Sequence, residues 1–82
     1  MNREDIFNLI VNHSCEVIPE LEGHNFKLVD RLVDLGANSV DRAEIVTMTM
    51  ESMALQFPRI ELFKAKNIGE LVEVFYEKSQ SV

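Results

Sequence analysis

The chain has 82 residues, enough for one small domain spanning residues 1–82 and too few for a cleft between two domains. Its apolar fraction of 46% with 27% charged residues is typical of a folded globular protein, and its single cysteine excludes an internal disulfide framework. Eight basic against fourteen acidic residues give a formal charge of −6, so we expect no nucleic acid partner, because nucleic acid phosphates bind to basic faces.

The first predicted helix begins after Asn2 and ends near Ile18. Apolar residues such as Ile6 and Ile10 recur at helical spacing, and the side chain of Asn2 can cap the first turn. Pro19 disfavours helical geometry in the residue before it, which sets the end of the helix. The N-terminal residues lack a basic segment followed by an apolar run, and no stretch reaches the length of a membrane span. We therefore expect a protein without membrane contact. The single cysteine, Cys15, fits a cytoplasmic location, and we expect a monomer.

Residues 19–38 are predicted to form a long connection. The segment is too apolar for a free linker, because it contains Phe26, Leu28, Leu32, Val33 and Leu35. We expect it to pack against the core.

A second helix is predicted to follow a bend at Gly36, which can adopt a left-handed backbone. Asn38 and Ser39 offer side-chain oxygens to the free amide groups at the start of this helix. No glycine or proline interrupts the chain until about Leu55, where we expect the helix to end.

Two further helices complete the predicted fold. A brief third helix is expected within residues 58–65, because proline suits the first turn of a helix. The last helix is amphipathic, contains Ile68, Leu71 and Phe75, and is capped by Asn67. The predicted fold is all-α: a small four-helix bundle with three main helices, a short third helix and a long loop after the first.

Ser39 lies where an attached anion is favoured. Amide groups point outward at a helix start and the helix dipole is positive there, so a phosphodiester on the Ser39 oxygen suits this position. Alternatively, Ser39 is only the cap of the helix, and its position alone favours this interpretation, because serine is a common cap.

The stretch around Ser39 resembles the signature of acyl carrier proteins, in which a leucine-glycine bend is followed by an acidic residue, a serine and an aliphatic residue. The residues concerned are Asp34-Leu35-Gly36-Ala37-Asn38-Ser39-Val40-Asp41-Arg42-Ala43-Glu44-Ile45-Val46, with Phe57-Pro58 and Asn67-Ile68-Gly69-Glu70-Leu71 as further matches. The likeness implies that a phosphopantetheinyl transferase attaches 4′-phosphopantetheine from coenzyme A to Ser39. It implies no catalytic residue and no metal. Asn38 stands where most members have aspartate, so it keeps the capping ability and lacks the negative charge that the transferase meets.

A finer resemblance is to the donor carrier proteins of polyketide β-branching. It depends on the segments Ser39-Val40-Asp41-Arg42-Ala43-Glu44-Ile45, Pro58-Arg59-Ile60-Glu61-Leu62 and Ala65-Lys66-Asn67-Ile68-Gly69-Glu70-Leu71. Ordinary fatty-acid carriers have a strongly acidic region at the second of these segments. The resemblance implies that the arm holds malonyl and then acetyl thioester and donates acetyl to a 3-hydroxy-3-methylglutaryl (HMG) synthase-like enzyme. A malonyl acyltransferase and a decarboxylating ketosynthase-like enzyme are further implied partners.

The surface that partner enzymes recognise is expected beside Ser39. An acidic helix face that Arg42 interrupts is suited to partner selection, since a mispaired charge rejects wrong partners. An ordinary solvated helix face is an equally open interpretation of Arg42. The expected partner-binding residues are Val40, Asp41, Arg42, Ala43, Glu44, Thr47, Arg59 and Ile60.

The sequence gives little support for a metal site or a hydrolase active site. His13, Cys15 and His24 match no metal-ligand spacing, and Asp41 stands where a hydrolase serine needs glycine. Two alternatives to the donor function remain, a carrier of another polyketide or fatty-acid pathway and an unmodified helical interaction module.

Overall fold

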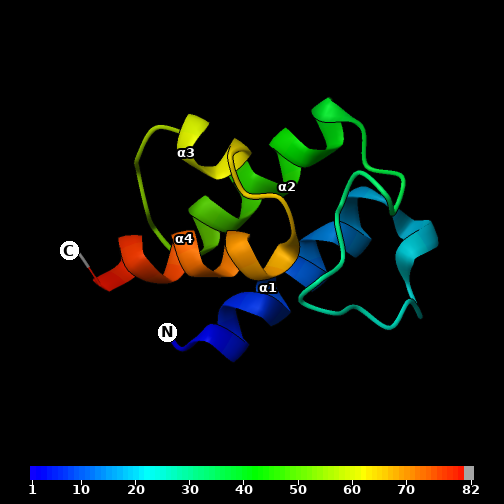
Figure 1. Cartoon of the computed structure of the whole chain (residues 1–82), viewed down its shortest axis with the longest axis horizontal. Helices are drawn as coiled ribbons and strands as arrows, with labels where there is room; N and C mark the ends of the chain where they lie inside the picture. Colours follow the sequence, from blue (N-terminus) through cyan, green and yellow to red (C-terminus); the bar gives the residue numbers. More distant parts are fainter. Residues whose placement is uncertain (81–82) are drawn as a thin grey trace.

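The computed structural model describes residues 1–80, and its regular elements over this range are all helical. The order along the chain is α1 (Arg3–Val17), a 3-10 turn η1 (Pro19–Leu21), α2 (Ser39–Ser52), α3 (Ile60–Phe63) and α4 (Ile68–Gln80). Helix α1 packs against both α2 and α4, and the long connection between η1 and α2 covers the end of the bundle away from the N-terminus (Figure 1). The predicted all-α bundle with three main helices and a short third one is confirmed.

The caps of α1 and α4 form as predicted. The Asp5 amide donates to Asn2 Oδ1 at 2.8 Å, and the Glu70 amide donates to Asn67 Oδ1 at 2.8 Å. Each bond satisfies an amide group that has no partner within its own helix. Helix α1 ends before Pro19, with Ile18 as its C-terminal cap.

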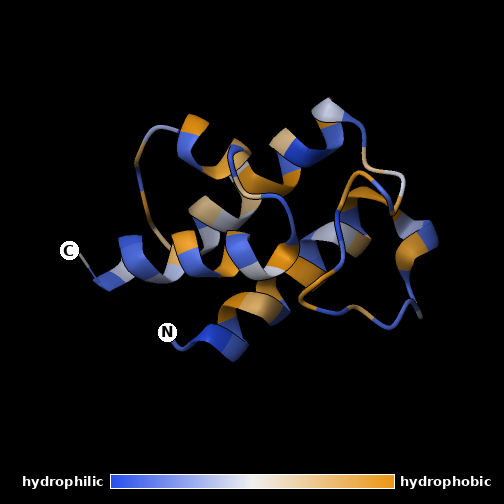
Figure 2. Cartoon of the chain, in the orientation of Figure 1, coloured by the Kyte–Doolittle hydropathy of each residue, from blue (hydrophilic) through white to orange (hydrophobic). Residues whose placement is uncertain are grey.

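The hydrophobic core lies where α1, α2 and α4 meet. Ile6, Ile10, Ile45, Ile68 and Phe75 are fully buried, and the apolar sides of the helices face inward (Figure 2). Burial of a side chain of this size stabilises a fold by about 1.5–3 kcal/mol relative to exposure. With one unpaired cysteine, the stability of the domain depends on this packing.

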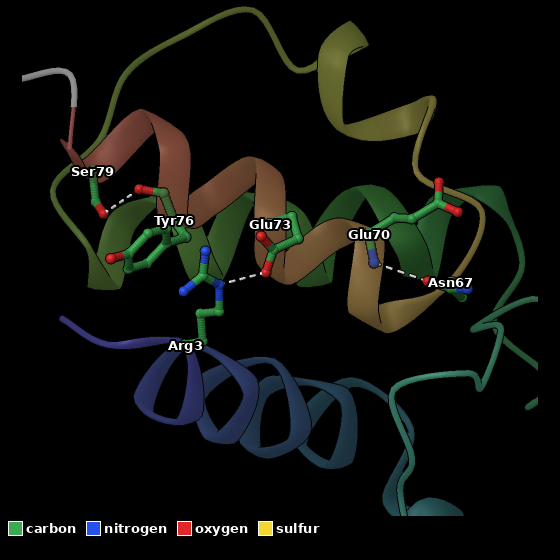
Figure 3. Close-up of polar contacts among 6 residues, drawn as sticks. All are labelled: Arg3, Asn67, Glu70, Glu73, Tyr76 and Ser79. Atoms are coloured by element: carbon green, nitrogen blue, oxygen red, sulfur yellow. Dashed lines mark hydrogen bonds and ion pairs between the residues drawn. The ribbon is translucent and has the colours of Figure 1, made fainter.

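A polar contact joins the first turn of α1 to α4. Arg3 Nε lies 2.7 Å from Glu73 Oε2, and the guanidinium sits 4.0 Å from the centre of the Tyr76 ring (Figure 3). The Arg3 and Glu73 side chains are 57% and 50% exposed, so solvent screens the ion pair and it contributes little to stability. The contact positions the N-terminus next to α4 more than it stabilises the fold.

The long connection is fastened to the start of α4 by its backbone. The Ile68 amide donates to the Asp30 carbonyl at 2.9 Å, and the Gly69 amide donates to the Leu28 carbonyl at 2.8 Å. A β-carbon at Gly69 would come within 3.1 Å of that carbonyl, which explains glycine here. The Asp30 carboxylate accepts from the Lys27 amide at 2.8 Å and lies 3.1 Å from His24 Nε2, and these contacts hold the pKa of Asp30 below its usual value.

The expected packing of the connection holds for some of its apolar residues only. Leu32 and Ala37 are buried, and Phe26 and Leu35 pack against the core. Leu28 and Val33 are 55% and 47% exposed. Two backbone contacts with α4 hold the segment down, so its apolar side chains need not all point inward.

Helix α2 is shorter than predicted, because it ends at Ser52 instead of near Leu55. Ala54 has a φ of 54°, and its amide donates to the Glu51 carbonyl at 3.1 Å while the Leu55 amide donates to the Met50 carbonyl at 3.0 Å. This is a Schellman ending, in which the left-handed residue is usually glycine. An alanine gives the sequence no sign of the stop.

Ala54→Gly is expected to raise the free energy of unfolding by about 0.5–1 kcal/mol. The left-handed conformation costs alanine about 1–2 kcal/mol, which outweighs the larger entropy of glycine in the unfolded chain. Urea denaturation measures the change, with Ala43→Gly inside α2 as the control expected to destabilise by about 0.5–1 kcal/mol. Equal destabilisation by both changes would contradict the strained ending.

Candidate functional site

Ser39 is the first residue of α2, and Asn38 before it is the cap. The Asp41 amide donates to Asn38 Oδ1 at 2.8 Å, and the Asn38 amide donates to Asp41 Oδ2 at 3.2 Å. This capping box satisfies the helix start without Ser39. The Ser39 side chain is exposed, and its hydroxyl has no hydrogen-bond partner among residues 1–80. The interpretation of Ser39 as only a cap is therefore wrong, and its oxygen faces solvent.

The bend before Ser39 is held from both sides. Gly36 has a φ of 98°, as expected for a left-handed bend, and the Ala37 amide donates to the Leu32 carbonyl at 3.1 Å. The Arg42 guanidinium donates to the Ala37 carbonyl at 2.6 Å, and Ala37 itself is 1% exposed. Ser39 thus projects from a short, anchored segment between a buried residue and a capped helix.

The surroundings of Ser39 fit a group attached through phosphate. The amides of Ser39 and Val40 precede the first intrahelical bond, from the Arg42 amide to the Asn38 carbonyl, and have no acceptor in the described chain. Outward amides and the positive end of the helix dipole favour a phosphate on the serine oxygen. The capping box uses the third amide and leaves the first two for an anion. Asp41 contributes an opposing charge, which its bond to Asn38 directs toward the cap.

The histidines and the cysteine do not form a reactive cluster. His13 Nε2 lies 2.8 Å from Ser52 Oγ and joins α1 to the end of α2, whereas His24 lies in the long connection beside Asp30. Burial and, less strongly, the charge of Glu22 raise the pKa of the Cys15 thiol, so little of it is thiolate at neutral pH. In residues 1–80 there is no group of three side chains suited to holding a metal ion. No helix within the same range combines the length and apolar character that crossing a membrane requires.

The predicted partner-binding residues lie on more than one side of α2 and at the start of α3. Val40, Ala43 and Thr47 share one side of the helix, since they are three and four residues apart, and Arg42 faces another side. Val40 and Ile60 are the most exposed apolar members, at 70% and 66%. The structure brings Thr47 and Arg59 together, because Arg59 donates to Thr47 Oγ1 at 2.7 Å. The remaining members differ in exposure: Glu44 is exposed, while Asp41, Arg42 and Ala43 are half-buried. The predicted residues therefore differ in accessibility, with Val40, Glu44 and Ile60 more exposed than Asp41, Arg42 and Ala43.

Two contacts of the site, the capping box and the bond from Arg42 to Ala37, were not predicted from the sequence. The capping box has a readable signal, an asparagine followed three residues later by an acidic residue. The bond from Arg42 to Ala37 has no such signal, because it depends on how the bend folds back on α2. Arg42 consequently shapes the segment that presents Ser39, in addition to interrupting the acidic face.

Comparison with known proteins gives two close relatives. None of the models of known protein families matches the chain. Over 81 residues it is 57% identical to the polyketide biosynthesis acyl-carrier-protein AcpK of Bacillus subtilis strain 168, covering 99% of both chains. Its structure matches a chain in the crystal structure of the curacin biosynthetic pathway HMG synthase in complex with acetyl donor-ACP, with a TM-score of 0.91 and 46% identity. That match covers 95% of this chain and 100% of the other.

Proposed function

The chain belongs to the acyl carrier proteins of polyketide biosynthesis, and we propose that it carries an acyl group on 4′-phosphopantetheine attached to Ser39 and donates acetyl to an HMG synthase-like enzyme. The observation that carries the proposal is the free Ser39 hydroxyl at an already capped helix start. A residue that contributes nothing to the local hydrogen bonds is available for modification without loss of structure.

The chain acts as a carrier and not as an enzyme. When bound, the phosphopantetheine arm supplies a thiol that holds the acyl group as a thioester. The chain's own residues position the attachment point: Asn38 and Asp41 fix the helix start, and Arg42 fixes the bend before it. Tethering then raises the effective concentration of the acyl group at a partner's active site.

The donor role is supported by the likeness to a chain in the crystal structure of an HMG synthase in complex with acetyl donor-ACP. Phosphopantetheinyl transferase, malonyl acyltransferase and a decarboxylating ketosynthase-like enzyme are proposed as the other partners. We propose that they meet the chain in the cytoplasm and approach the face of α2 and α3 that surrounds Ser39. Exposed apolar residues flanked by charge, as at Val40 and Ile60, suit transient recognition of this kind.

The test of the donor role is acetyl transfer from the loaded chain to an HMG synthase-like enzyme of polyketide β-branching. Transfer is followed by intact mass of both proteins, with a known donor carrier as positive control and a fatty-acid carrier as negative control. We expect transfer at a rate comparable to that of the known donor. Efficient loading without transfer would favour a carrier for another polyketide or fatty-acid pathway.

Arg42→Glu is expected to slow this acetyl transfer by about tenfold or more, because a reversed charge at a contact costs at least about 1.4 kcal/mol. Loading of Ser39 should change less than transfer, because the capping box still fixes the helix start when the bond from Arg42 to the Ala37 carbonyl is lost. Lys27→Glu makes the same charge change outside the proposed contact face and should leave transfer unaffected, and Arg42→Lys should retain most of it. Unchanged transfer kinetics in Arg42→Glu would place recognition elsewhere.

A further inference from the structure

An open groove of about 600 Å³ runs between the long connection, α2 and the α3–α4 region. Its apolar lining includes Leu32, Val46, Leu62 and Leu71, which are buried or nearly so. At the rim, Val33 and Phe63 are 47% and 53% exposed. The groove therefore combines an apolar floor with an apolar rim.

The groove concentrates positive charge in an acidic protein. Arg31, Arg42, Lys64 and Lys66 line it, which is four of the eight basic residues of the chain, and no acidic residue lines it. Arg31 lies 3.8 Å from Asp34, and Arg42 donates to an uncharged carbonyl. Within the described residues, neither lysine ammonium group has an ion-pair partner. At least three of the four cations are thus uncompensated.

The groove begins on the helix face that carries Ser39. Arg42 and Val46 follow Ser39 by three and seven residues, and this spacing places side chains on one face of a helix. One turn of helix is about 5.4 Å long, so the groove starts about one turn beyond the attachment point. A group tethered to Ser39 is therefore held at high local concentration beside the groove.

We infer that this groove binds the end of the tethered acyl group and prefers an acyl group that ends in a carboxylate, such as malonyl, over the neutral acetyl group. The inference rests on the proposed function and deepens it. The apolar floor accommodates the linking carbons, and the unpaired cations that line the groove attract the carboxylate. The groove thereby holds the tethered malonyl group more strongly than the tethered acetyl group.

Removal of the carboxylate releases the acyl group from the groove. In that reaction, which a partner enzyme performs, the bond between the α-carbon and the carboxylate breaks, carbon dioxide leaves and the α-carbon takes up a proton. The remaining acetyl group is uncharged and gains nothing from the four cations. The acetyl form is then free to extend toward the synthase, so the groove helps to distinguish the two loading states.

The experiment compares the chain loaded from coenzyme A, acetyl-coenzyme A and malonyl-coenzyme A by a broad phosphopantetheinyl transferase. Intact mass confirms each form before and after amide NMR spectra are recorded. We expect the malonyl form alone to shift the amides of Val33, Phe63 and residues 64–66, and added salt to reduce these shifts. Failure to load would contradict the proposed function, whereas loading with identical acetyl and malonyl spectra overturns the groove alone.

Paired variants identify the charges responsible. Lys64→Gln/Lys66→Gln should remove more than half of the malonyl-specific shift, while Lys27→Gln/Lys78→Gln, with the same change in net charge, should retain it. Equal effects of the two pairs overturn recognition by the groove. Shifts at the groove that arise only when the synthase is added also overturn it, because they identify the groove as a contact for a partner's acidic surface.

Discussion

Replacing Ser39 with alanine is expected to abolish the mass gain that the chain shows after incubation with a phosphopantetheinyl transferase and coenzyme A. The change removes the oxygen that forms the phosphodiester. It should not disturb the fold, because the Ser39 hydroxyl has no hydrogen-bond partner in residues 1–80 and the capping box is made by Asn38 and Asp41. The variant should unfold within about 0.5 kcal/mol of the parent chain, as exposed substitutions usually do.

Ser52→Ala is the matched control for this experiment. Ser52 lies on the same helix, is exposed and contacts His13, so the substitution removes a serine hydroxyl without touching the start of α2. It should load like the parent chain. A full mass gain in Ser39→Ala would show that another residue carries the arm.

Phe75→Ala is expected to lower the free energy of unfolding by about 3–5 kcal/mol, the usual cost of truncating a buried phenylalanine. Phe75 is 0% exposed in α4, and its ring lies 6.1 Å from that of Phe57 in an edge-on arrangement. Small domains have about 5–15 kcal/mol of stability in total, so this one change removes a large share of it. Urea denaturation followed by circular dichroism measures the loss.

Phe63→Ala provides the comparison for Phe75→Ala. Its side chain is 53% exposed, so the same truncation should cost less than about 1 kcal/mol. Similar losses in the two variants would mean that the core does not lie where α1, α2 and α4 meet.

The helical elements were predictable from the sequence because each has a local signal. Asn2 and Asn67 cap their helices as expected, Pro19 follows the end of α1, and Gly36 takes the left-handed bend. The position of Ser39 at the start of α2 was likewise predictable. The role of Ser39 as an attachment site was inferred from the family resemblance, since a capping serine and a modified serine have the same position at a helix start.

The features that were not predictable depend on contacts between distant residues. Ala54 ends α2 in a conformation that the sequence gives no reason to expect from alanine. Arg42 reaches back to the Ala37 carbonyl, which requires the bend to be folded. The basic groove is assembled from three separate segments, so its cations are scattered along the sequence and their grouping is visible only in space.

Peptide mapping of the parent chain, after treatment with a phosphopantetheinyl transferase and coenzyme A, tests whether Ser39 carries the arm. Trypsin cleaves after Arg31 and Arg42 and releases residues 32–42, in which Ser39 is the sole hydroxyl-bearing residue. We expect one 4′-phosphopantetheinyl group on this peptide and none on the others. An unmodified peptide 32–42 from a chain that has gained the mass, or no mass gain with any transferase, would contradict it.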